Sequence, residues 1–81
     1  MNTPDICRAI LNVLASTDGW PLDEDLLHEH ARSKGHHTRA EFDAALKLLD
    51  EQGFATSKPG EFGGPSKWMI TEKGDAYRRS R

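Results

Sequence analysis

The stretch TRAEFDAALKLLDEQGFA at residues 38–55 decides the fold. Thr38, followed three residues later by Glu41, is the capping-box pattern that begins a helix. Apolar residues then recur at the spacing of one helix face: Phe42, Ala45, Leu46 and Leu49. Gly53 has the residue type that commonly ends a helix at the C′ position. We therefore predict an amphipathic helix over residues 38–52, with its apolar side facing a core.

A first helix is predicted from Thr3, which is suited to be the N-cap, with Pro4 at the first helical position. The turn-forming residues 16–19 end it. Its apolar face is formed by Ile6, Ile10, Val13 and Leu14. Cys7 and Leu11 widen that face, so this helix either is central and contacts two neighbours or also packs against a second subunit.

A second helix is predicted after a short extended segment at residues 20–22, because the residue before a proline is biased away from helical backbone. The acidic run Asp23, Glu24 and Asp25 suits the first turn of that helix, where carboxylates complement the helix dipole. Its expected inner side consists of Leu26, Leu27, His30 and Ala31. Gly35 then allows a tight turn into the third helix.

A β-hairpin is predicted to follow the third helix. Residues 54–58 and 66–70 have strand character, and the loop at 59–65 is rich in glycine and proline. Trp68 either anchors the hairpin to the core or stacks on a ligand or base, and Thr71 caps a short final helix. We therefore expect an α+β fold in one domain, residues 1–81, with a three-helix core, a C-terminal hairpin and a short last helix.

This order of elements is that of a winged helix-turn-helix, and two stretches resemble that superfamily directly. Residues 38–55 look like its third helix and the exit from it. The stretch GGPSKWMITEKGDAYRR at residues 63–79 is similar to the returning wing strand and next helix start of bacterial PadR-like and MarR-like regulators. The resemblance implies a third helix that enters the major groove of DNA and a wing that contacts the backbone or minor groove beside it.

Composition limits the class of protein. The chain has 81 residues, of which 30% are charged, a net charge of −2 and a mean hydropathy of −0.71. No apolar run approaches the roughly 20 residues of a membrane span, so we expect a soluble, cytoplasmic protein that contacts no membrane. A single cysteine, Cys7, excludes an internal disulfide framework and a cysteine zinc cluster. Acidic residues dominate residues 1–30 and basic residues dominate residues 53–81.

A nucleic-acid interface is expected where the turn, the third helix and the wing bring polar side chains together. The helix projection places Ala40, Asp43, Ala44, Lys47 and Glu51 outward, flanked by Arg39. Arg39 and Lys47 are expected nearest the bases, and Asp43 can accept a hydrogen bond from a cytosine amino group. His36 and His37 are either solvated turn residues or donors to phosphates. The full candidate set is Lys34, His36, His37, Thr38, Arg39, Asp43, Lys47, Lys58 and Lys67.

Two functions remain open at this stage. The first is a small DNA-binding transcriptional regulator, expected to act as a homodimer on double-stranded DNA. The alternative is a protein-interaction module, favoured by the negative net charge, the acidic, alanine-rich face of the third helix and a possible exposure of Leu48, Leu11 and Phe62. Leu48 either packs under the second helix or is offered to a partner.

Catalysis finds no support in the sequence. No catalytic constellation, metal site or cofactor site stands out, and Cys7 on an apolar helix face suits a buried, inert thiol. We therefore do not expect an enzyme. A small-molecule sensor would need a pocket, which nothing in the sequence demands.

Overall fold

The computed structural model describes residues 2–18 and 20–80 of the chain. Over these residues it is an α+β fold of four α-helices, one short 3-10 turn and one three-stranded antiparallel sheet with strand order β1-β3-β2. The elements are α1 Thr3–Ala15, β1 Leu22–Asp23, α2 Glu24–Arg32, α3 Arg39–Glu51, β2 Ala55–Lys58, the 3-10 turn Glu61–Gly63, β3 Lys67–Ile70 and α4 Glu72–Arg79.

Helix α3 begins and ends as its sequence predicts. The Thr38 hydroxyl accepts a hydrogen bond from the backbone N–H of Glu41 at 3.1 Å, and the Glu41 carboxylate accepts one from the backbone N–H of Thr38 at 2.9 Å. The backbone hydrogen bond from Thr38 is the main reason that the pKa of Glu41 lies below its ordinary value. Gly53 follows the helix with φ of 76°, a left-handed conformation that favours glycine.

Helix α1 is the centre of the core and packs against α2, α3 and α4. Cys7 and Leu11, which widen its apolar face, are only 3% and 0% exposed. The predicted exposure of Leu11 is therefore wrong, because its own chain covers this flank and leaves neither side chain free for a second subunit. The N-cap also differs from the prediction by one residue: the Asn2 side chain, not that of Thr3, accepts the hydrogen bond from the backbone N–H of Asp5.

Helix α2 buries a narrower face than the sequence predicts. Leu27 and Ala31 are fully buried, whereas Leu26 is 43% exposed and His30 is exposed. These residues form two pairs with i, i+4 spacing, 26 with 30 and 27 with 31, rotated by about 100° from one another on a helix. Only the second pair faces α1. The prediction that Leu26 and His30 lie on the inner side of this helix is therefore wrong.

The sheet joins the predicted hairpin to a strand whose pairing the sequence did not predict. In the hairpin, Ala55 pairs with Ile70 and Lys58 with Lys67. On the other edge of β3, β1 pairs through Leu22 opposite Trp68. Trp68 is 8% exposed and belongs to the core cluster, so the predicted anchoring of the hairpin is confirmed.

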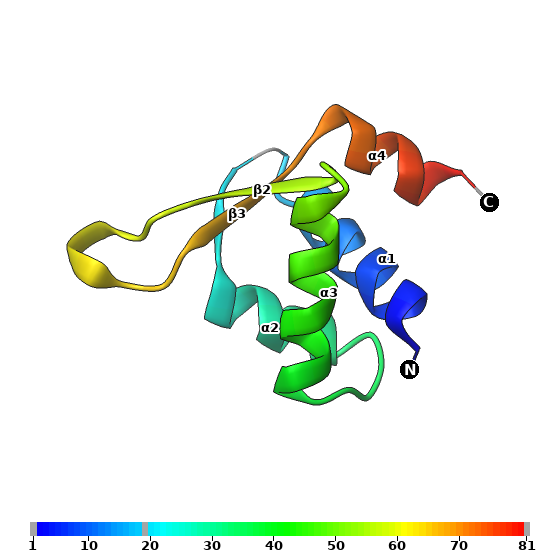
Figure 1. Ribbon diagram of the computed structural model, residues 1–81, viewed down its shortest axis with the longest axis horizontal. Coiled ribbons are helices and arrows are strands. Elements are labelled where there is room, and N and C mark those ends of the chain that lie inside the picture. The colour runs from blue at the N-terminus through cyan, green and yellow to red at the C-terminus, as the bar shows by residue number, and fades with distance from the viewer. Residues whose placement is uncertain (1, 19, 81) are drawn as a thin grey trace.

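The arrangement of the elements leaves one end of the hairpin free. Figure 1 shows β2 and β3 extending away from the helices to a loop far from the body, while α4 lies toward the opposite end of the molecule. This layout is compatible with that of a winged helix. Among residues 2–18 and 20–80, no helix has the length and apolar character needed to cross a membrane.

Candidate nucleic-acid interface

The exposed side of α3 and the adjoining hairpin form the surface predicted to contact nucleic acid. We call this surface the α3–hairpin face; it comprises Arg39, Ala40, Asp43, Ala44, Lys47, Lys58 and Lys67. The side chains from α3 and Lys58 are exposed and Lys67 is half-buried. The predicted outward direction of the α3 residues is therefore confirmed.

Arg39, expected nearest the bases, is held by carboxylates of its own chain. Its Nε donates to the Asp43 carboxylate at 3.0 Å, and one terminal nitrogen donates to Asp25 at 3.2 Å. The other terminal nitrogen lies 3.7 Å from a carboxylate oxygen of Glu24. The hydrogen bond to Asp43 is the largest influence that raises the pKa of Arg39. Arg39 therefore connects the start of α2 to the start of α3, and its charge is compensated by carboxylates of its own chain.

The candidate lysines differ from Arg39 in their ion pairing. None of Lys34, Lys47, Lys58 and Lys67 lies within ion-pair distance of a carboxylate in the described part of the chain. Lys58 and Lys67 are direct partners across the hairpin, and Lys67 also pairs in register with Asp23 of β1. Like charges directly opposite one another on a sheet are destabilising, typically by a few tenths of a kcal/mol. A bound anion between the two lysines would relieve this repulsion.

The remaining turn residues do not all join the face. Lys34 lies beside α1, where it lines a shallow hollow with Asp5, Arg8, Ala9 and Asn12. His36 is exposed. Thr38 is also exposed, but its hydroxyl is occupied by the cap of α3. Lys47 therefore lies on α3 and Lys58 and Lys67 lie on the hairpin, whereas Lys34 lies next to α1.

His37 is buried, which corrects its interpretation as a solvated turn residue. It is 4% exposed, its Nδ1 lies 3.1 Å from the carbonyl oxygen of Gly35, and its ring stacks on Phe42 with 6.2 Å between centroids. A carbonyl can only accept, so Nδ1 carries the proton in this hydrogen bond. The Nε2 atom is also buried. His37 therefore helps to build the turn, and we leave it out of the interface.

His28 is a histidine of α2 whose role the sequence did not predict. Its ring packs on Phe42 with 4.6 Å between centroids and meets His37 edge-on at 5.6 Å. Burial lowers the pKa of His28 below its ordinary value, and the nearby charge of Arg39 lowers it further. In the sequence, His28 stands out only as the neighbour of the apolar Leu27. Its contact with Phe42 can be predicted only once the orientation of α2 in the fold is known.

The lowered pKa of His28 predicts acid sensitivity. Well above a pH of about 6.5 the imidazole is neutral in the folded and unfolded chains and has no effect on the pH dependence of stability. As the pH falls below this value, the unfolded chain binds the proton first, so the free energy of unfolding decreases until the native pKa is passed. We expect His28→Leu to reduce the loss of stability between pH 7.5 and 5.5 in urea titrations. Equal pH dependence in the variant and the wild-type chain would contradict this role of His28.

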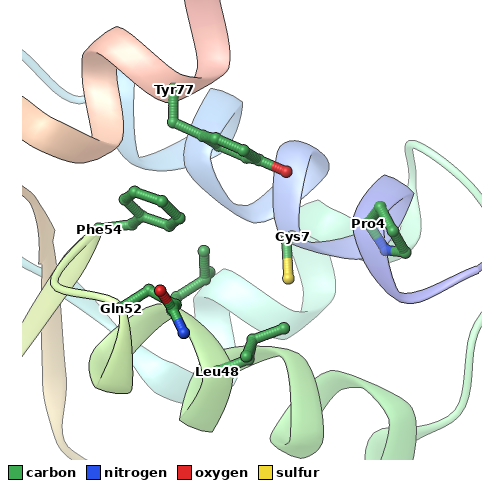
Figure 2. Close-up of a pocket in the computed structure, with 7 residues that line it drawn as sticks. Pro4, Cys7, Leu48, Gln52, Phe54 and Tyr77 are labelled. Carbon is green, nitrogen blue, oxygen red and sulfur yellow. The ribbon is translucent and has the colours of Figure 1, made fainter.

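A second feature is an apolar pocket of about 210 Å³ between α1, the end of α3 and α4. Figure 2 shows its walls: Pro4 and Cys7 of α1, Leu48 and Gln52 at the end of α3, Phe54 after it, and Tyr77 of α4. Leu48 is 39% exposed at this site, so it is not packed under α2. Burial raises the pKa of the Cys7 thiol, which keeps it protonated, as expected for an inert cysteine.

Comparisons with known proteins add no relative. The sequence matches no protein-family model, and neither the curated proteins nor the solved structures contain a match.

Proposed function

We propose that this chain is a winged helix-turn-helix protein that binds double-stranded DNA, with α3 as the groove-facing helix and the β2–β3 hairpin as the wing. Three features support the proposal: the order of the elements, the exposed outer side of α3, and a hairpin that projects beyond the body (Figure 1). As a transcriptional regulator it would act as a homodimer, which doubles the number of cations that meet the phosphates.

Contacts to phosphates would dominate the binding. Lys47 on α3 and Lys58 and Lys67 on the wing form no ion pair in the described chain, so their charges are available to the DNA backbone. The side chains on α3 that would face base edges are mostly small, since Ala40 and Ala44 offer only methyl groups. Of the candidates to contact bases, Asp43 and Arg39 are bonded to each other, which leaves Lys47. We therefore expect weak sequence preference and strong dependence on salt.

The observation that carries the proposal is the pairing of Lys58 with Lys67 directly across the wing. Two cations placed opposite one another suit a ligand that presents closely spaced negative charges, as a DNA backbone does. Asp23 lies opposite Lys67 on the other edge of β3, and Glu24 and Asp25 hold Arg39. The electrostatic attraction would therefore rest on Lys47, Lys58 and Lys67.

Replacing both wing lysines is expected to weaken DNA binding. We expect the wild-type chain to bind a random 20-base-pair duplex in fluorescence anisotropy at about 50 mM salt, with an affinity that falls as salt is raised. In Lys58→Gln/Lys67→Gln, the affinity should fall about tenfold or more. The slope of log affinity against log salt should decrease by roughly 2, because each phosphate that a lysine no longer neutralises removes about 0.9 from it.

Lys73→Gln is the matched control, because Lys73 is an exposed cation on α4, which lies toward the end of the molecule opposite the hairpin loop (Figure 1). Its ammonium lies over the Phe54 ring. Its removal should change the affinity less than threefold. Absence of binding by the wild-type chain at tens of micromolar, or equal effects of the double variant and the control, would refute the proposal.

A protein-interaction module is the second candidate, favoured by the compensated charge of Arg39 and by the apolar pocket where Leu48 is exposed. A chain that binds no duplex at low salt would favour this candidate over DNA binding.

A further inference from the structure

Phe62 is the most exposed large apolar residue of the described chain. It lies in the 3-10 turn at the tip of the hairpin and is 103% exposed, so its ring contacts nothing in its own chain. Its φ of 55° and ψ of 35° put it in the left-handed region, which bulky side chains rarely adopt. Strained backbone that persists in a folded protein is often connected with function.

The surrounding loop fixes the shape of the tip. A Cβ on Gly60 would overlap the carbonyl oxygen of Pro65, so the two ends of the loop pass in direct contact and only glycine fits there. The backbone N–H of Gly64 donates to the carbonyl of Glu61 at 3.0 Å, and Gly63 has φ of 73°. The loop is therefore a defined turn that holds Phe62 away from the hairpin rather than letting it fold back.

We infer that Phe62 is a wedge that enters the minor groove and inserts its ring at a base step, partly unstacking the two base pairs. This inference rests on the proposed DNA-binding function and assigns a separate task to the wing tip. An apolar side chain inserted in this way replaces ring–water contact with contact to base faces, and it bends the duplex toward the major groove. Pyrimidine–purine steps unstack most easily, so they are the expected targets.

The residues beside the tip favour DNA as the partner of this ring. Lys58 and Lys67 are the last paired residues of the hairpin, one on each strand, so two cations flank the base of the tip. As a direct cross-strand pair they project from the same face of the hairpin, where both can meet neighbouring phosphates beside the groove that the ring enters. Glu61, which precedes Phe62, is acidic and does not attract phosphates. The electrostatic attraction between the tip and the DNA backbone must therefore come from the two lysines.

The test uses a 16-base-pair duplex of alternating T and A, with one central adenine replaced by 2-aminopurine, whose fluorescence increases when it is unstacked. We expect the wild-type chain to increase this fluorescence on binding. Phe62→Ala should bind at least tenfold more weakly by anisotropy, with an unchanged salt slope and no fluorescence increase, because alanine keeps the same backbone strain and removes only the ring. Phe62→Trp should remain within about threefold of wild type and keep the increase.

Trp20→Ala is the matched control, since Trp20 is a 75% exposed aromatic residue in the α1–β1 connection rather than at the tip. Its affinity and fluorescence change should equal those of wild type. If Phe62→Ala binds as tightly as wild type, or if it gives the same fluorescence increase, the wedge is refuted while DNA binding stands. If the wild-type chain binds no duplex, the proposed function fails and the wedge fails with it.

Discussion

Phe42→Ala is expected to lower the free energy of unfolding by about 3–5 kcal/mol, the usual cost of removing a fully buried phenyl ring. Phe42 is 0% exposed and lies where α2, α3 and the turn between them meet. Its ring contacts His28 and His37, and the guanidinium of Arg39 lies 5.4 Å from its centroid. A domain of this size has a total stability near the low end of the roughly 5–15 kcal/mol range, so the variant should be only marginally folded at 25 °C.

The measurement is urea unfolding followed by far-ultraviolet circular dichroism. Leu48→Ala is the control on the same helix, because Leu48 is 39% exposed and should cost less than about 1 kcal/mol. A Phe42→Ala protein whose stability lies within about 1 kcal/mol of wild type would show that this ring does not join α2 to α3.

Gly74→Ala is expected to destabilise the chain by about 2–3 kcal/mol, although the same exchange in an exposed helix stabilises by about 1 kcal/mol. Gly74 lies in the first turn of α4, and an added Cβ would overlap the carbonyl oxygen of Phe54 and lie 3.1 Å from Cγ1 of Ile70. The Phe54 carbonyl also accepts the backbone N–H of Thr71 at 3.2 Å, so it cannot move without breaking that hydrogen bond. The substitution should therefore shift α4 and separate Tyr77 from Phe54, whose rings are 4.6 Å apart.

Gly63→Ala is the matched glycine exchange for this prediction. A Cβ there meets nothing within 4 Å, so only the positive φ opposes it, at a cost of about 1 kcal/mol. Thermal unfolding of the two variants compares the two costs. A Gly74→Ala protein as stable as wild type, or more stable, would mean that α4 is not seated against Phe54 as described.

Local signals predicted the elements whose ends are set by neighbouring residues. Thr38 and Glu41 begin α3, Gly53 ends it, and the Thr71 side chain caps α4 by accepting from the backbone N–H of Gly74. The hairpin was predicted because its two strands are separated by a loop rich in turn formers. All of these signals depend on residues that lie close together along the chain. The ends of these elements can therefore be predicted from the sequence alone.

The features that the sequence did not predict depend on contacts between distant segments. The acids before α2 suit a helix N-terminus, and only the packing of α2 on α3 brings Asp25 to Arg39, fourteen residues later. The packing of α2 on α1 decides that Leu27 rather than Leu26 faces the core. The pairing of β1 with β3 joins residues more than forty positions apart, and a two-residue strand carries too little pattern to predict its partner.

DNA binding by the α3–hairpin face is tested most directly by ¹⁵N–¹H correlation spectra of the chain titrated with a random 16-base-pair duplex at low salt. We expect shifts in the amides of the exposed side of α3, including Ala40, Ala44 and Lys47, and of the hairpin from β2 through the tip to β3, with α1 and α4 unaffected. No shifts at millimolar duplex, or shifts confined to the pocket around Leu48 and Tyr77, would contradict the proposed interface.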